Sequence, residues 1–136
     1  MTELTLHSQS IKTVFDLLGS DENHMTFSLG WALARSRTFL ISFATLMGIQ
    51  GGFSEDVRLH LQEHQSGMGI TDLEFIDLGR HHIIMEAKRG FTVPSLKQLS
   101  KYATRLKKND DPASRRLLIV LAESDRQEQW LGRNYD

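Results

Sequence analysis

Apolar residues in the first third of the chain recur at helical spacing. They predict a short helix over Ile11–Leu18, a second from about Ser20 to Ser36 and a third over Arg37–Met47. Glycines follow the first and third segments, as is typical of helix ends. The second helix has an apolar stripe at spacings of four, three and one, namely Met25, Leu29, Ala32 and Leu33. The aromatic side chains of Phe27 and Trp31 are expected in the core.

From residue 57, apolar residues begin to recur at every second position. Residues 57–62 alternate apolar and polar, which predicts a half-buried strand. After a turn over Gln65–Gly69, two β-rich runs at 70–77 and 82–88 flank a glycine turn and complete an antiparallel meander.

A helix and one further strand follow the meander. Ser95 opens a helix that runs to about Lys108, and Leu117–Leu121 is a continuous apolar run typical of a strand covered on both faces. The path from strand 82–88 through this helix to the last strand has the length of a parallel crossover, which is nearly always right-handed.

The order of these elements predicts a mixed α/β fold: N-terminal helices, a three-stranded antiparallel meander, a crossover helix and a fourth strand. At 136 residues the chain is expected to form a single domain. Residues 1–19 are interpreted as a helical extension, 20–122 as the core and 123–136 as a tail, in which Glu128–Leu131 is a helical fragment.

The candidate site residues lie on the predicted hairpin. Glu86 and Lys88 lie two apart on one strand and therefore share a face, about 6–7 Å apart along the backbone. An odd-length loop or a bulge, with Gly79 or a neighbour at positive φ, would place Asp72 on that face, opposite Glu86 or Lys88. Two carboxylates and an ammonium would then converge, which suits a divalent metal and a phosphate. The alternative is a surface hairpin with a solvated Glu and Lys.

Composition narrows the class of protein. There is no cysteine, which excludes disulfides and thiolate metal sites. The N-terminus lacks the features of a signal peptide, and the most apolar segment, Thr38–Ile49, is too short to span a bilayer. A cytoplasmic protein without a membrane segment is expected.

The net charge of −1 indicates no global basic field, but the C-terminal third differs. Between Lys97 and Arg116 seven basic residues face two acidic ones. Four of the basic residues recur at spacings of 4, 4 and 3 on the predicted helix and form one candidate phosphate-contacting stripe: Lys97, Lys101, Arg105 and Lys108. The alternative is an ordinary solvated helix face.

The order of elements, with Asp72 on the second strand, Glu86-x-Lys88 on the third and Gln98 on the next helix, resembles the PD-(D/E)XK nuclease superfamily. The resemblance covers about residues 20–122, with Thr71 where the namesake proline would stand. It implies a restriction-endonuclease-like core.

The resemblance also implies roles for individual residues. Asp72 and Glu86 would bind a metal together with the Ala87 carbonyl, and Lys88 would be the catalytic lysine. Gln98 and Tyr102 match the family's Gln-x-x-x-Tyr on the helix after the site, with Gln98 expected to be catalytic and Tyr102 expected to contact nucleic acid. Glu22 matches the acidic residue of its first helix.

The implied activity is Mg²⁺-dependent hydrolysis of phosphodiester bonds, in DNA rather than RNA, with Mn²⁺ as a substitute. Such a small nuclease domain is expected to act as a homodimer or as a module of a larger assembly. The rival hypothesis is a catalytically silent nucleic-acid-binding or scaffold domain of the same fold.

Several of these residues also have simpler interpretations. Gln98 could bond back to the Ser95 amide in a capping box, and Glu22 could be a first-turn acid. Lys88 could form only an ion pair. His60-x-x-Glu63-His64 matches an inverted zinc-peptidase motif, but that motif needs a helix and this segment alternates like a strand. His81 and His82, beside the turn, are expected to face solvent.

Overall fold

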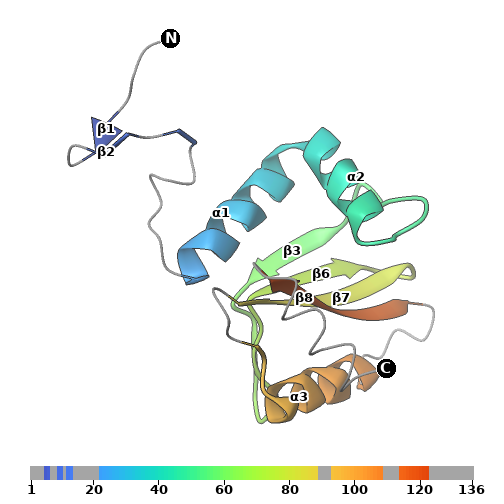
Figure 1. Cartoon of the computed structure of the whole chain (residues 1–136). Helices are drawn as coiled ribbons and strands as arrows, with labels where there is room; N and C mark the ends of the chain where they lie inside the picture. The colour runs from blue at the N-terminus through green and yellow to red at the C-terminus, as the bar shows by residue number, and fades with distance from the viewer. Residues whose placement is uncertain are drawn as a thin grey trace.

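A four-stranded mixed sheet carries helices on both of its faces (Figure 1). The computed structural model describes residues 5–6, 9–10, 12–13, 22–88, 93–108 and 114–122. Within these residues, the helices are α1 (Glu22–Arg35), α2 (Arg37–Leu46) and α3 (Leu96–Lys107). The sheet has the order β3-β6-β7-β8, formed by β3 (Arg58–Leu61), β6 (Leu73–Asp77), β7 (His81–Lys88) and β8 (Arg115–Ala122). Two small hairpins are β1 (Thr5–Leu6) with β2 (Gln9–Ser10), and β4 (His64–Gln65) with β5 (Gly69–Ile70).

Strand pairing follows the predicted meander and crossover. β3, β6 and β7 pair antiparallel in sequence, whereas β7 and β8 pair parallel and are joined through α3. The mixed α/β class, the meander and the parallel last strand are therefore confirmed.

Local signals explain where two of the helices begin. Ser36 caps α2 by accepting a hydrogen bond from the Phe39 amide at 3.2 Å, and Ser95 caps α3 by accepting from the Gln98 amide at 3.1 Å. Gly48, with φ of +75°, follows the end of α2 in the left-handed conformation that favours glycine.

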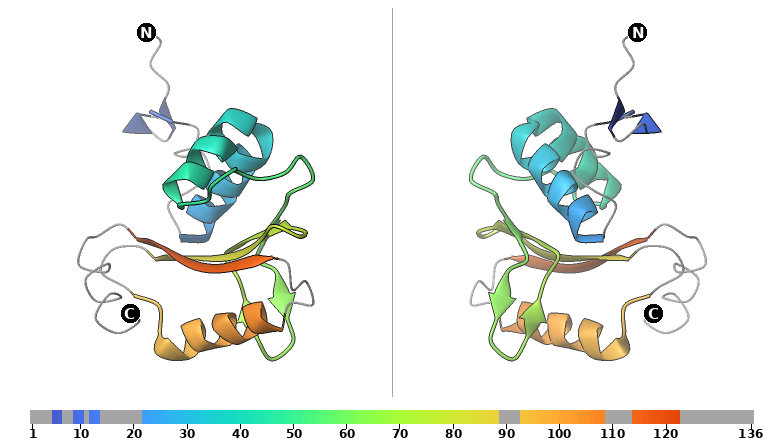
Figure 2. Two further views of the ribbon diagram at one scale, coloured as in Figure 1. Left: turned by 90° about the vertical axis from the view of Figure 1, so that its right-hand side faces the viewer. Right: turned by 90° about the vertical axis from the view of Figure 1, so that its left-hand side faces the viewer.

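The sheet separates two apolar layers, with α1 and α2 on one face and α3 on the other (Figure 2). On the first face the rings of Phe43 and Phe53 each stack on Phe75 of β6. On the second face Ile84 of β7 packs with the α3 residues Tyr102 and Leu106. Because side chains alternate along a strand, β7 contributes Ile83 and Met85 to the first layer and Glu86 to the second.

Two aromatic residues do not lie in the core as predicted. Trp31 is 57% exposed and Phe27 is 36% exposed. The reason is the close approach of α1 to β3 at Gly30, where a Cβ atom would lie 2.8 Å from a methyl carbon of Leu61. The helix therefore turns its small residues toward the sheet, and the two large rings flank the contact.

The predicted strand at 70–77 is interrupted. Its first residue belongs to β5, and the rest forms β6 after the break at Thr71 and Asp72. The predicted turn before it is the tip of the β4–β5 hairpin, with Gly67 and Gly69 at positive φ.

Other predicted elements lie largely or wholly outside the described residues. Lys12 and Thr13, the described part of the predicted Ile11–Leu18 helix, are not helical. The fragment Glu128–Leu131 lies entirely outside.

Candidate active site

The β6–β7 hairpin brings the two predicted carboxylates together. Its ladder runs from Asp77 opposite His81 to Leu73 opposite Met85, around a three-residue loop in which Gly79 has φ of +75°. One step beyond the ladder, Asp72 stands opposite Glu86. The predicted odd-length loop with a positive-φ glycine is confirmed. Asp72 itself lies outside β6, but its charge raises the pKa of Glu86, so the two carboxylates are neighbours.

Asp72 is held by the backbone of the neighbouring strand. Its Oδ2 accepts a hydrogen bond from the Ala87 amide at 2.8 Å, in the position where a strand partner would otherwise accept it. Because the N–H and C=O of one strand residue point to the same side, the Ala87 carbonyl also faces the Asp72 side of β7. Three oxygen-bearing groups of the predicted metal set therefore lie around the end of the hairpin.

Three side chains hold the carboxylate of Glu86. Gln98 Nε2 donates to Oε1 at 2.7 Å, Lys88 Nζ lies 2.9 Å from the same oxygen, and Tyr102 Oη lies 3.0 Å from Oε2. Gln98 and Tyr102 lie one turn apart on α3, so both reach the same strand.

This arrangement distinguishes between the interpretations of Gln98. The Ser95 half of the capping box forms, but the Gln98 side chain bonds Glu86 rather than returning to the Ser95 amide. Lys88 does form the ion pair of its simpler interpretation, and that pair lies inside the candidate site.

The surroundings of the site shift the pKa values of Glu86 and Tyr102. Burial raises the pKa of Glu86, the hydrogen bond from Lys88 opposes this rise, and the nearby Asp72 charge adds to it. Burial also raises the pKa of Tyr102 to about 12, so its phenol stays protonated. The negative charges of Asp72 and Glu86 repel each other, and the Lys88 ammonium offsets part of that repulsion.

Tyr102 does not lie on a nucleic-acid-binding surface as predicted. Its side chain is 2% exposed, and its Oη lies 2.6 Å from the Ile70 carbonyl as well as 3.0 Å from Glu86 Oε2. The ring packs in the apolar layer under α3, which leaves only the hydroxyl to serve the site.

Arg105 does not belong to the predicted phosphate-contacting stripe. It is 5% exposed, and its Nη2 pairs with Glu74 Oε2 at 2.7 Å. The buried Glu74 carboxylate requires a charged partner, and the arginine side chain is directed inward to supply it. Lys97, Lys101 and Lys108 remain exposed along α3.

Sequence reasoning missed the polar cluster around Glu74. This carboxylate also lies 2.5 Å from His82 Nε2 and accepts from the Thr71 hydroxyl at 3.3 Å. Burial alone would raise its pKa, but the His82 hydrogen bond and the Arg105 charge outweigh burial and lower it. Glu74 lies two residues after Asp72, so strand spacing already placed it on the candidate face.

The prediction that His81 and His82 face solvent was wrong, since both are buried. His82 is turned to Glu74, while the ring of His81 meets Phe53 edge-on on the other side of the sheet.

The remaining candidates fall elsewhere. Glu22 is the first residue of α1, and its side chain lies outside the described part of the chain. His60 lies in β3 and His64 in β4, so the helix that a zinc-peptidase motif needs is not formed. Among the described residues no group of three or more His, Cys, Asp or Glu side chains could hold a metal ion. The candidate site offers two carboxylates and a carbonyl instead.

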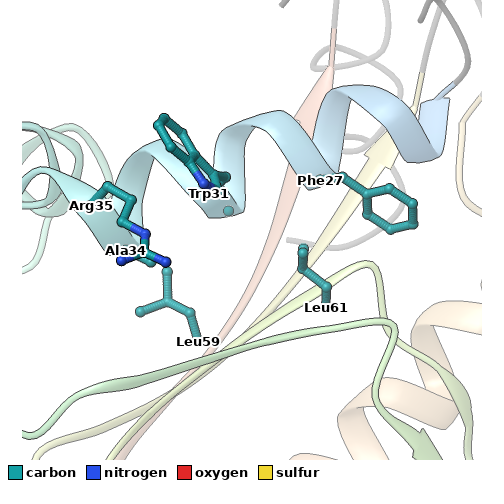
Figure 3. A pocket seen from close by; sticks show the side chains of 7 residues that line it. Phe27, Trp31, Ala34, Arg35, Leu59 and Leu61 are labelled. Carbon is teal, nitrogen blue, oxygen red and sulfur yellow. The ribbon is translucent and has the colours of Figure 1, made fainter. Parts of the chain in front are cut away.

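An apolar groove lies on the opposite side of the sheet from Glu86, between α1 and the edge strand β3 (Figure 3). Its volume is about 840 Å³, and Phe27, Trp31 and Leu61 are among the side chains that line it. It contains none of the predicted site residues.

Comparison of the chain with protein-family models, curated proteins and solved structures found no match. In the part of the chain that the structure describes, no helix has the length and apolar character needed to cross a membrane.

Proposed function

We propose that this chain is a metal-dependent nuclease of the PD-(D/E)XK type, which hydrolyses phosphodiester bonds in DNA. The observation that carries the proposal is the proximity of the Asp72 and Glu86 carboxylates at the open end of the β6–β7 hairpin, with Lys88 Nζ 2.9 Å from Glu86 Oε1. Two carboxylates with an ammonium beside them match the chemistry of phosphate hydrolysis at a divalent cation.

The order of elements supports a restriction-endonuclease-like core. Helices precede an antiparallel meander, and a crossover helix leads to a parallel fourth strand. The Asp72 and Glu86 pair lies at the end of β6 and β7, and α3 covers the same face of the sheet.

The donor atoms fit Mg²⁺, which prefers oxygen ligands and uses one or two carboxylates together with water and substrate phosphate. Asp72, Glu86 and the Ala87 carbonyl would hold the ion. When bound, it would polarise the scissile phosphodiester and acidify the attacking water. Mn²⁺, with similar ligand preferences, would substitute.

The protein's own side chains have separate roles. Lys88, on the same face as Glu86, would orient the attacking water and stabilise the negative charge that develops on the phosphate. Gln98 and Tyr102 restrain the Glu86 carboxylate from α3, so its oxygens need little reorganisation. The exposed Lys97, Lys101 and Lys108 on the same helix would contact the phosphate backbone.

A cleavage assay tests this proposal. The purified chain is incubated with plasmid, linear duplex, single-stranded DNA and RNA in the presence of Mg²⁺, Mn²⁺ or EDTA. We expect metal-dependent cleavage that EDTA abolishes, with DNA as the better substrate. Binding of DNA without cleavage under any metal would favour the rival hypothesis of a catalytically silent domain.

Asp72→Asn should weaken Mn²⁺ binding and abolish cleavage, because it removes one of two carboxylates. Asp77→Asn is the matched control: Asp77 is buried at the end of β6 far from Asp72, and its asparagine could still accept from the Ser54 amide, now at 2.9 Å. Calorimetric titration with Mn²⁺ measures both. Equal affinity in the wild type and Asp72→Asn would place the metal elsewhere.

A further inference from the structure

The guanidinium of Arg105 joins three separate segments of the chain. Its Nη2 donates to Glu74 Oε2 at 2.7 Å, and its Nη1 donates to the carbonyls of Glu63 at 3.1 Å and Gly69 at 3.3 Å. The planar fork of arginine can serve a carboxylate and backbone carbonyls together, which the single ammonium of lysine cannot reproduce. The side chain is buried, so these bonds form away from bulk water.

These partners flank Asp72 on both sides. Glu74 follows it by two residues on the same face of the sheet. Gly69 precedes it on β5, and the Glu63 carbonyl also accepts the Thr71 amide at 3.1 Å. Arg105 therefore holds the chain three residues before and two residues after the candidate metal ligand.

The same helix restrains the facing carboxylate. Tyr102, one turn before Arg105, has its hydroxyl 2.6 Å from the Ile70 carbonyl and 3.0 Å from Glu86 Oε2. Arg105 and Tyr102 thus each make two kinds of contact. Each bonds a carbonyl of the β4–β5 hairpin, and each also contacts a carboxylate of the candidate site, Glu74 for Arg105 and Glu86 for Tyr102. The spacing between Asp72 and Glu86 depends on how α3 is seated against that hairpin.

A buried ion pair is a weak source of net stability, because desolvation of both charges offsets their attraction. The main effect of the Arg105 contacts is therefore expected to be on the placement of the segments that they join. We infer that Arg105 is a positioning residue for Asp72, which fixes this carboxylate opposite Glu86 through Glu74 and the root of the β4–β5 hairpin. This inference rests on the proposed metal-dependent function.

Two variants test the inference, and both are designed to fold. Arg105→Lys keeps a positive charge beside Glu74 but loses the fork that reaches two carbonyls. Arg105→Met combined with Glu74→Gln removes both charges of the ion pair but leaves an amide as a hydrogen-bond partner for His82 and Thr71, so the neutral cluster stays satisfied. Arg37→Met is the matched control, because Arg37 also donates to two loop carbonyls, those of Phe53 and Ser54, on the other face of the sheet.

The first readout is Mn²⁺ affinity by calorimetry. Loss of a residue that orients a metal ligand commonly weakens binding by about tenfold or more, and we expect that in both Arg105 variants but not in Arg37→Met. The melting temperature, measured in parallel, separates this effect from general destabilisation. Wild-type Mn²⁺ affinity in both folded Arg105 variants, or the same loss in the control, would overturn the inference.

The second readout does not need metal or substrate. The Ala87 amide donates to Asp72 Oδ2, so its hydrogen exchange reports on the placement of that carboxylate. Exchange at Ala87 should be faster in both Arg105 variants and unchanged in Arg37→Met, and unchanged exchange in the Arg105 variants would overturn the inference. If the wild type binds no Mn²⁺ and cuts no nucleic acid, the proposed function fails, and exchange at Ala87 still decides whether Arg105 positions Asp72.

Discussion

In the proposed mechanism Lys88 differs from the two carboxylates, because it would act on the phosphate without holding the metal. Lys88→Ala should abolish cleavage yet retain or tighten Mn²⁺ binding, since a positive charge next to Glu86 is removed. Lys88→Arg should also abolish cleavage, because a planar, permanently protonated guanidinium cannot replace the compact ammonium. Single-turnover cleavage together with Mn²⁺ titration separates the two effects. Robust cleavage by Lys88→Ala would remove the lysine from the mechanism.

His81 should make stability depend on pH. Burial lowers its pKa below the ordinary 6.5, with Asp77 opposing and Arg80 and Arg115 assisting. The unfolded chain therefore binds a proton near pH 6.5 that the folded chain resists, and stability falls as the pH drops below that value. His81→Leu should reduce the loss of melting temperature between pH 7.5 and about 5.5.

The matched control for this effect is His64→Leu, because His64 is exposed on β4. It should leave the pH dependence of the melting temperature as in the wild type. If His81→Leu and the wild type lose the same number of degrees, the buried imidazole is not the group responsible.

At the scale of single residues, parity along strands predicted Asp72 beside Glu86 or Lys88 but could not decide between them. The same rule could not show where Arg105 points. On a helical wheel Arg105 lies at the boundary of the buried arc formed by Leu99, Tyr102 and Leu106. The Arg105 side chain points inward because it pairs with the buried Glu74 of another element, and the periodicity of the helix gives no information about that partner.

At the scale of elements, α3 is the candidate surface for duplex DNA. Removing one lysine that binds a phosphate should reduce the slope of log affinity against log salt by about 0.9. Lys97→Ala and Lys101→Ala should each flatten the slope by that amount, because both side chains are exposed on this helix. Arg35→Ala, an exposed cation of α1 on the other side of the sheet, should not. Equal slopes in all three variants would mean that the α3 lysines are simply solvated.

The boundaries of α2 and α3 could be predicted because each has a helical period and begins after a capping serine. Those of β7 could be predicted because its β-rich run follows the glycine turn. The break between β5 and β6 could not. Residues 70–77 are apolar enough for one strand, and the interruption comes from hydrogen bonds that tie Thr71 back to Glu63. Hydrogen bonds between two separate segments do not affect the spacing of apolar residues, so the sequence pattern does not show them.

At the scale of the whole molecule, the exposed basic surface of one copy is small for a duplex. We predict that the chain self-associates into a symmetric pair, which would double both the α3 lysines and the cutting centres. Light scattering at micromolar concentration, with and without duplex DNA, measures the mass. A monomer under both conditions would contradict the prediction.

The bond from the Ala87 amide to Asp72 gives the candidate metal ligand a second task as a backbone acceptor. Replacing Asp72 with alanine would remove that acceptor and cost about 1 kcal/mol of stability, apart from any effect on metal. Asparagine keeps a side-chain oxygen for the amide while discarding the carboxylate charge. Asp72→Asn is therefore the natural substrate trap, a folded protein suited to capturing uncut DNA for isolation and sequencing.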